Sequence, residues 1–572
     1  MTLGEPAGRY LQALRRDARQ VYGQQGEEVA RSLERLARSF REAHPRDAVP
    51  PERRMTANDT ILISYADSIR NEAEPPLRTL ARWLAGPLSD TVSTVHLLPF
   101  YPWSSDDGFA VRDYRAVEPS YGDWDDVHAL AKDHRLMFDA VVNHASAQGA
   151  WFDGFLRDQE PWRSWFRTEA EHADVASIVR PRTTPLLTPF DTAAGRRWVW
   201  TTFGPDQADL DYAEPSLLLE MAGILLEYVG HGAEVLRMDA VTYLWKELGS
   251  SGVHHPNTHA VLRIVRSLLE IAAPWVVVLT ETNVPHQENL SYFGQGDDEA
   301  QMVYNFALPT LMAHTAVAHD TSALTTWARG LRTPGPSTWL LNFLASHDGI
   351  GLRSAEGLLA PKAVDRLIER TVRAGGGVGR KRDSDGSDSP YELNVNYFDL
   401  LAEPGTTEPL ARQVDRFAAL HAVAMALPGV PALYLHSLLG SRGSPELASS
   451  SGMPRAVNRA KLDHDRLKVE LSDPDGRRAR VLDALARLLR ARRRHPAFDP
   501  SAPHQVVDTP PSVFAVRRTG PAGEVDAWHE LAGETVTVRL PRGGKNLLSG
   551  APVEAGTHTL APYQVLWVDP AG

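Results

Sequence analysis

The chain has 572 residues, 43% of them hydrophobic, and a formal net charge of −12, which predicts one large folded domain with appended segments and argues against nucleic acid as the main partner. It contains no cysteine, and this excludes disulfides, thiolate metal sites and a cysteine nucleophile. The first residues lack the pattern of a secretory signal and no apolar run approaches ~20 residues, so we expect a cytoplasmic protein without membrane contact.

Residues 1–57 form the first segment, which is rich in Arg, Ala, Leu and Glu. Its apolar residues recur at helical spacing between Leu11 and Leu36, and this pattern predicts two amphipathic helices. Two prolines, Pro50 and Pro51, follow and close the segment. We therefore expect a helical extension that packs on the main body.

From Thr60 onward, short apolar strands alternate with helical stretches. The helical stretches are predicted at 77–84, 123–132, 216–228, 258–272 and 308–331. The strands are predicted at 61–67, 92–100, 135–144, 233–239, 276–282, 302–306, 338–348 and 432–437. This alternation predicts an α/β fold, a (β/α)8 TIM barrel that occupies residues 58–498.

Two long insertions, at residues 145–212 and 349–409, interrupt the alternation. Both follow predicted strand ends that carry polar residues, where insertions of a barrel normally shape the active site. From about Asp499 the pattern turns to short strands, at 512–517, 534–540 and 564–568. We expect residues 499–572 to form an antiparallel β-sandwich domain with a structural role.

Polar residues follow several of the predicted barrel strands. Because the carboxyl ends of parallel barrel strands meet at one face, these residues are expected to share one site. The set consists of Asp106 after the second strand, Asn143 and His144 after the third, Arg237 and Asp239 after the fourth, Glu281 after the fifth, and His347 and Asp348 after the seventh.

The chemistry that such a site can perform is retaining glycosyl transfer. Arg237 and Asp239 lie two apart on a strand, so they point to the same side, and the guanidinium keeps the carboxylate ionised. Glu281 follows the apolar run 276–279, which favours a raised pKa. An ionised nucleophile beside a protonated acid is what this reaction needs. Taken singly, the same residues are also compatible with structural ion pairs and a loop hydrogen-bond network.

Four ordered motifs in this set resemble those of the α-amylase family: Asp139-Ala-Val-Val-Asn-His144, Leu236-Arg-Met-Asp239, Glu281 and Ser346-His-Asp348. The resemblance covers residues 60 to about 498. It implies a retaining enzyme in which Asp239 is the nucleophile, Glu281 the acid/base and Asp348 the transition-state stabiliser. By the same resemblance, the glucosyl ring is held by His144, Arg237 and His347.

The pattern Arg237-x-Asp239-Ala-Val-x-Tyr243-x-x-Lys246 resembles the sucrose phosphorylase branch of that family more than ordinary amylases. This resemblance implies that the glucose pocket also contains Asp106, Phe109, Tyr243 and Arg459. It implies phosphate binding by Arg182 and Tyr391. For Arg182 the alternative is a salt bridge inside the insertion. No metal and no organic cofactor is implied.

Further details resemble the glucosylglycerate phosphorylases of this branch, among them the stretch Leu279-Thr-Glu-Thr-Asn-Val-Pro-His286, the loop 101–109 and the helical extension. The implied reaction is retaining phosphorolysis of 2-O-α-D-glucosyl-D-glycerate to α-D-glucose 1-phosphate and D-glycerate. The implied partners are the glucoside and inorganic phosphate, in a monomer or homodimer. The stretch 249–255 departs from the expected run. The cation for the glycerate carboxylate stays open among Arg180, Arg182, Lys246, His254, His255 and His259.

Several alternatives remain from the sequence. Sucrose phosphorylase and the phosphorylases of glucosylglycerol or sucrose 6'-phosphate would use the same machinery with another acceptor. A retaining α-glucosidase would use water in place of phosphate. A non-catalytic sugar-binding relative would be expected to lack part of the catalytic triad, and all three residues are present here.

Overall fold

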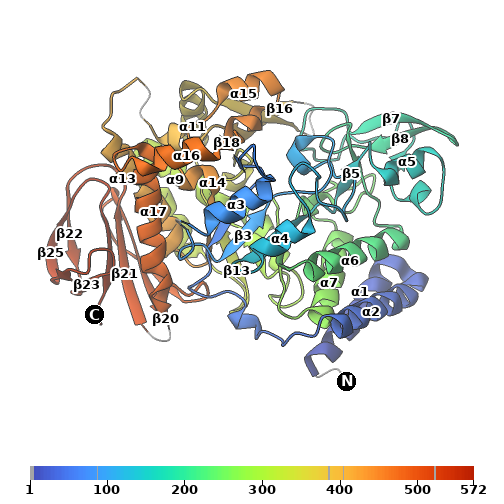
Figure 1. The fold of residues 1–572 in the computed structure, drawn as a ribbon, viewed down its shortest axis with the longest axis horizontal. Coiled ribbons are helices and arrows are strands. Elements are labelled where there is room, and N and C mark those ends of the chain that lie inside the picture. Colours follow the sequence, from blue (N-terminus) through green and yellow to red (C-terminus); the bar gives the residue numbers. More distant parts are fainter. Residues whose placement is uncertain (1–4, 87, 384–386, 403–404, 521–522, 572) are drawn as a thin grey trace.

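The computed structural model describes residues 5–86, 88–383, 387–402, 405–520 and 523–571. Within them, parallel strands close into a barrel in which neighbouring strands follow chain order. In Figure 1 the barrel lies between the C-terminal β structure on the left and the N-terminal helices on the right. Its strands are β1 (Ile61–Ser64), β3 (Thr94–Leu97), β4 (Arg135–Ala140), β10 (Ala233–Met238), β11 (Val277–Thr280), β12 (Met302–Tyr304), β13 (Trp339–Asn342) and β17 (Val430–Tyr434). Each coincides with a predicted strand, so the (β/α)8 prediction is confirmed.

The barrel strands are short apolar runs that are buried on both faces, toward the barrel interior and toward the helices. The strands end earlier than predicted, because their last polar residues bend into the loops of the upper face. One register pair matters for the site: Asp139 of β4 lies opposite Arg237 of β10. In a parallel pair these two side chains point the same way, so the fold itself brings the carboxylate and the guanidinium together.

Helices surround the barrel. They include α3 (Pro76–Leu84), α4 (Trp124–Leu130), α6 (Pro215–Gly230), α7 (Pro256–Ala272), α9 (Ala307–Ala318), α10 (Ser322–Gly330), α13 (Leu410–Ala426) and α17 (Arg477–Arg493). The single helical stretch predicted at 308–331 is two helices. His319 ends α9 in a left-handed conformation with φ of 55°, and Asp320 accepts a hydrogen bond from the Ser322 amide at the start of α10.

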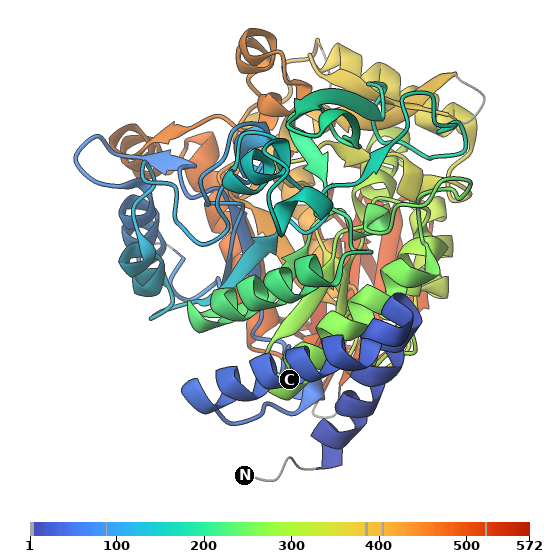
Figure 2. The same cartoon turned by 90° about the vertical axis from the view of Figure 1, so that its right-hand side faces the viewer.

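The N-terminal segment forms the two predicted helices, α1 (Glu5–Tyr22) and α2 (Gly26–Ala43). They lie together against α6 and α7 on the outside of the barrel (Figure 2). Leu14 of α1 and Leu33 of α2 are completely buried in this contact. Beyond them, Arg54 forms a buried two-pronged ion pair with Glu270 of α7, at 2.5 and 2.9 Å, which fixes the segment to the barrel.

Both insertions are folded above the barrel. The first pairs β5 (His144–Ser146) with β9 (Gln207–Asp209) and contains α5 (Ala150–Leu156) and a sheet of β6 (Thr168–Glu169), β8 (Gly195–Trp200) and β7 (Leu187–Thr192). The second contains α11 (Pro361–Arg373), α12 (Tyr397–Leu401) and a sheet of β14 (Ile350–Gly351), β16 (Asp388–Asn394) and β15 (Gly377–Arg382). Shorter elements are β2 (Ile69–Arg70), β18 (Leu462–Asp463), α8 (His286–Leu290), α14 (Leu435–Leu438), α15 (Pro445–Ser451) and α16 (His464–Ser472).

The C-terminal segment is antiparallel β structure, as predicted. The larger sheet orders β19 (His504–Val507), β20 (Val513–Gly520), β21 (Gly523–Glu530), β26 (Val565–Asp569), β23 (Gly544–Asn546) and β24 (Pro552–Val553), and the smaller sheet pairs β22 (Val536–Leu540) with β25 (Gly556–Leu560). Trp528 and Leu560 belong to a separate apolar cluster that joins the two sheets. Phe514 and Trp567 instead join the core of the barrel. The exact domain boundaries at 57 and 498 stay a prediction.

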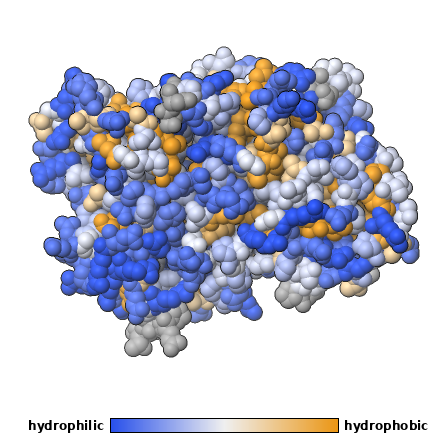
Figure 3. Space-filling model, turned by 180° about the vertical axis from the view of Figure 1, so that it is seen from behind, coloured by the Kyte–Doolittle hydropathy of each residue, from blue (hydrophilic) through white to orange (hydrophobic). Residues whose placement is uncertain are grey.

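The surface seen from behind is mainly hydrophilic, with apolar side chains in separate patches (Figure 3). Val372 and Val469 are the large apolar side chains that stay mostly exposed on the described chain. Within the described ranges, every helix is too short or too polar to cross a membrane.

Candidate active site

A pocket opens at the upper face of the barrel, where the strands end. It brings together eleven of the twelve residues to which the sequence assigns a catalytic or binding role; Arg459 is the exception. Asn143, which was also expected at this face, does not line the pocket and accepts a hydrogen bond from Lys246. Arg459 lies immediately behind the pocket wall and touches its residues. The eleven are Asp106, Phe109, His144, Arg182, Arg237, Tyr243, Asp239, Glu281, His347, Asp348 and Tyr391.

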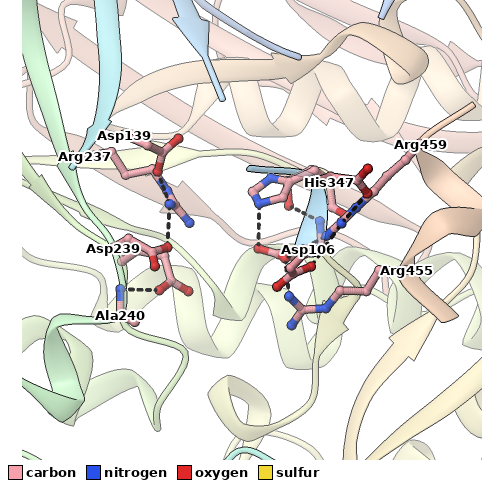
Figure 4. A network of polar contacts seen from close by, with 12 residues as sticks. Asp106, Asp139, Arg237, Asp239, Ala240, His347, Arg455 and Arg459 are labelled. Carbon is pink, nitrogen blue, oxygen red and sulfur yellow. Dashed lines mark hydrogen bonds and ion pairs between the residues drawn. The ribbon is translucent and has the colours of Figure 1, made fainter. Parts of the chain in front are cut away.

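Arg237 lines the pocket and lies between two carboxylates, those of Asp139 and Asp239 (Figure 4). Its Nη1 donates to Asp139 and, at 2.7 Å, to Oδ1 of Asp239. Asp139 is itself held by Nε2 of His96 at 2.7 Å. Burial alone would raise the pKa of Asp139, but Arg237 and His96 hold it below its ordinary value. The chain His96–Asp139–Arg237 thereby fixes one oxygen of Asp239 and leaves the other toward the pocket.

Asp239 and Glu281 face each other across the end of β10. Ala240, in a left-handed conformation with φ of 51°, turns the chain after Asp239, and its amide donates to Oε2 of Glu281 at 3.1 Å. Burial raises the pKa of both carboxyl groups, so the pair favours holding a proton. Asp239 is in contact with a guanidinium and Glu281 is not, and this contact favours the ionised form of Asp239.

Asp348 is the third carboxylate of the pocket. Nη1 of Arg455 contacts its Oδ1 at 2.6 Å, and Arg455 also makes a two-pronged bond to Glu392 at 2.9 and 2.7 Å. Burial alone would raise the pKa of Asp348, but Arg455 and His347 hold it well below its usual range. Asp348 therefore stays ionised. Neither Arg455 nor Glu392 is among the sequence-predicted site residues.

The far end of the pocket is built on a tight loop. Asp106 and Asp107 both have positive φ values, of 54° and 49°. Both carboxylates accept a hydrogen bond from Nη1 of Arg459, at 3.2 and 2.8 Å. Phe109 of the same loop stacks on His347 with ring centroids 5.0 Å apart and an interplanar angle of 4°. Arg459 Nε also donates to the His347 carbonyl at 3.0 Å. Acceptors and a flat apolar surface thus stand side by side, as a sugar ring requires.

Two histidines of the site are neutral. Burial lowers the pKa of His144 to about 4, and its Nε2 lies 3.0 Å from the Phe109 carbonyl. Burial also lowers the pKa of His347 to about 3. Both side chains therefore act as hydrogen-bonding groups at neutral pH.

Arg182, Phe203, Tyr243 and Tyr391 also line the pocket. The Phe203 ring meets Tyr243 edge-on at 5.5 Å and lies 6.0 Å from the Arg182 guanidinium carbon. Arg182 forms no ion pair with any described residue. The salt bridge inside the insertion, which is the structural alternative to phosphate binding by Arg182, is therefore not formed among these residues.

Of the six cations considered for the acceptor carboxylate, Arg182 alone lines the pocket in the described residues. Lys246 is buried and its Nζ donates to Asn143 Oδ1 and the Leu210 carbonyl, at 2.8 and 3.0 Å. The remaining four also have other contacts. Arg180 donates to the Thr184 carbonyl, His254 contacts Glu288, His255 contacts Glu247 and His259 contacts Glu299.

Sequence reasoning missed other pocket residues as well. Arg455 begins the same short stretch as Arg459, and Glu392 follows Tyr391 directly, so both had a neighbouring signal. Phe203 and Asn283 also line the pocket. The only sequence signal for Phe203 is its place in the first insertion, and for Asn283 its place two residues after Glu281.

Comparison with known proteins gives a consistent result. The catalytic domain of α-amylase matches residues 91–357. A glucosylglycerate phosphorylase of Allomeiothermus silvanus is 42% identical over 551 residues, which cover 96% of each protein. A sucrose phosphorylase of Agrobacterium vitis is 31% identical, covering 78% of this chain and 89% of its own. The crystal structure of sucrose 6F-phosphate phosphorylase from Thermoanaerobacter thermosaccharolyticum shares the fold, with a TM-score of 0.74, 22% identity and coverage of 88% and 98%. This chain belongs to the α-amylase family, in the branch of the glucosylglycerate and sucrose phosphorylases.

Proposed function

We propose that this protein is a glucosylglycerate phosphorylase, which converts 2-O-α-D-glucosyl-D-glycerate and inorganic phosphate into α-D-glucose 1-phosphate and D-glycerate with retention. The observation that carries the proposal is one pocket with a pair of unequal carboxyl groups and a guanidinium that has no carboxylate partner among the described residues. The likeness to the Allomeiothermus silvanus enzyme supports the choice of acceptor.

In the first half of the reaction, Asp239 attacks C1 of the glucosyl group. The bond from C1 to the glycosidic oxygen breaks as the bond from C1 to the Asp239 carboxylate forms, giving a β-glucosyl-enzyme. Glu281 gives its proton to the departing oxygen, so that D-glycerate leaves with a hydroxyl group. The contact with Arg237 keeps Asp239 ionised for the attack.

In the second half, a phosphate oxygen attacks C1 from the side that glycerate left. The ester bond to Asp239 breaks, and the Glu281 carboxylate takes the proton of the attacking phosphate hydroxyl. Two inversions give net retention, and each residue returns to its first state. Asp348, ionised beside Arg455, stabilises the positive charge that develops on the sugar ring in both halves.

The remaining predicted residues take binding roles in this proposal. His144, His347, Phe109 and Tyr243 surround the glucosyl ring, together with Asp106 and Arg459. Arg182 and Tyr391, which both line the pocket, bind phosphate. We further propose that the enzyme works in the cytoplasm on small molecules, without nucleic acid or membrane partners and without a cofactor.

A donor comparison tests the proposal. Purified protein is given phosphate with glucosylglycerate, sucrose or glucosylglycerol at equal concentration, and glucose 1-phosphate is measured. The proposal predicts the highest kcat/KM for glucosylglycerate. A higher value for sucrose or glucosylglycerol would keep the mechanism and overturn the acceptor.

A further inference from the structure

The charges that line the pocket are paired unevenly. Five carboxyl groups are present: Asp106, Asp239, Glu281, Asp348 and Glu392. Among the lining arginines, Arg237 contacts Asp239 and Arg455 contacts both Asp348 and Glu392. Arg182 contacts no carboxylate of the described chain. An anion that enters the pocket therefore meets one guanidinium that it can bind without breaking an existing ion pair.

Arg182 is held in place without using up its donors. It is half-buried, and its single hydrogen bond within the described residues runs from Nη1 to the Pro181 carbonyl at 3.3 Å. Its guanidinium lies beside the Phe203 ring. None of its nitrogens is a buried atom without a partner, so the N–H groups that have no partner are accessible, on a residue that lines the pocket. A planar guanidinium with free N–H groups matches carboxylates and phosphates equally well.

The two anions of the proposed reaction arrive at the same point. In glucosylglycerate, the carboxylate is bonded to the carbon that carries the glycosidic oxygen. In phosphate, the charged oxygens are bonded to the phosphorus that carries the attacking oxygen. Because leaving and attacking oxygens use the same side of C1, next to Glu281, both anionic groups come to the same part of the pocket. The ionised carboxylate of Asp348 repels an anion that approaches it instead.

We propose that Arg182 is a shared anion-binding residue, which binds the carboxylate of glycerate in the first half of the reaction and phosphate in the second. This inference rests on the proposed function and extends it from phosphate to the acceptor. The enzyme then distinguishes glucosylglycerate from an uncharged glucoside through the same side chain with which it selects phosphate over water.

The test measures kcat/KM of each glucosyl donor for the Arg182→Ala variant, with phosphate as the second substrate. In a two-step reaction through a glucosyl-enzyme, this quantity reports the first half alone and does not depend on phosphate. Loss of a charge-assisted contact predicts a fall of about 10- to 100-fold for glucosylglycerate. Glucosylglycerol and α-glucosyl fluoride, which carry no carboxylate, are predicted to change by less than about threefold.

Two further variants serve as controls. Arg180→Ala removes a neighbouring arginine that lies outside the pocket, and it should leave all donors unchanged. Arg182→Lys keeps the charge and should restore part of the loss for glucosylglycerate.

Two results would overturn the shared role. One is an Arg182→Ala variant that needs more phosphate but keeps its kcat/KM for glucosylglycerate; the phosphorylase assignment would then stand. The other is an equal loss for all three donors, which would mean that Arg182 only supports the structure. Failure of the wild-type protein to use glucosylglycerate would instead refute the proposed function itself.

Discussion

At the scale of single residues, Asp239 and Glu281 are set apart by what touches them. Asp239 has the Arg237 guanidinium at 2.7 Å, whereas Glu281 has the uncharged amide of Ala240 at 3.1 Å. Burial raises the pKa of both, and the guanidinium in contact with Asp239 favours the ionised form of that carboxyl group. The proposed roles of nucleophile and acid rest on this difference in contacts.

Replacing Glu281 by Gln tests the acid role. The amide cannot give a proton to the leaving oxygen, so kcat/KM for glucosylglycerate should fall by about 10²- to 10⁴-fold. The fluoride ion of α-glucosyl fluoride leaves without needing that proton, so kcat/KM for this donor should fall by less than about tenfold. The Asp239→Ala variant is the comparison, because it should lose both donors. Equal slowing of both donors by Glu281→Gln would remove Glu281 from the acid role.

The pH dependence follows from the same raised pKa. Glu281 must be protonated for the first step, so kcat/KM for glucosylglycerate should fall as the pH rises through that pKa. His144 and His347, with pKa values of about 4 and about 3, stay neutral above pH 5 and do not contribute to this fall. A pH profile recorded with α-glucosyl fluoride should lack the alkaline fall. The same alkaline fall for both donors would contradict the assignment.

At the scale of elements, the loop after β3 shows how a backbone conformation places a binding group. Gly108 has φ of 112°, and a Cβ atom there would lie 2.5 Å from the Pro99 carbonyl oxygen. Asp106 and Phe109 stand on either side of it, so the contact with Pro99 sets where both side chains point. The neighbours Asp106 and Asp107 also have positive φ values, and Arg459 compensates by bonding both.

The Gly108→Ala variant should lose both stability and glucose binding. Strain and the clash together predict a loss of about 2 kcal/mol or more in the free energy of unfolding. The KM for glucosylglycerate should rise as the loop shifts. Gly195 is a matched control, since it has φ of 107° but nothing within 4 Å of its Cβ position. Thermal unfolding and kinetics of both variants check this, and similar behaviour of the two would show that the Pro99 contact is unimportant.

The elements that could be predicted from sequence are those whose pattern is local. Each barrel strand is a short apolar run, and each was found within a few residues. The strand ends, by contrast, depend on where polar residues leave the barrel. The break at His319 depends on one residue in a left-handed conformation, within a stretch whose apolar residues continue on both sides.

The site was predictable where residues belong to barrel strand ends, and less so where the insertions contribute. Asp239, Glu281 and Asp348 follow strands and meet as expected. The pair Arg455–Glu392 joins residues 63 positions apart, through a sheet that folds back over the barrel. No local pattern reveals such a contact, nor that Lys246 points away from the pocket to bind Asn143.

At the scale of the whole molecule, one buried arginine joins three separate parts of the chain. Arg492 of α17 is completely buried and donates to the carbonyls of Ala57, Met425 and Phe498, at 2.8, 3.2 and 3.1 Å. It thereby connects the end of the N-terminal segment, the helix before the last barrel strand and the end of the barrel segment, just before the C-terminal segment begins. Buried carbonyl groups need such donors.

The Arg492→Met variant should therefore destabilise the whole molecule. It leaves several buried carbonyls without a donor, and this predicts a loss of about 3 kcal/mol in the free energy of unfolding. Arg494→Met, at an exposed position two residues on, should change it by less than about 0.5 kcal/mol. Equilibrium denaturation measures the free energy of unfolding of both variants. Equal stability of the two would show that the carbonyl contacts of Arg492 contribute little.

The most direct test of the central claim is to follow the wild-type protein by nuclear magnetic resonance with glucosylglycerate and inorganic phosphate. The account predicts α-D-glucose 1-phosphate and D-glycerate in equal amounts, and only traces of product when phosphate is omitted. Free glucose formed at the same rate with and without phosphate would mean that the protein is a hydrolase. The β anomer of glucose 1-phosphate would contradict the two-step reaction through Asp239.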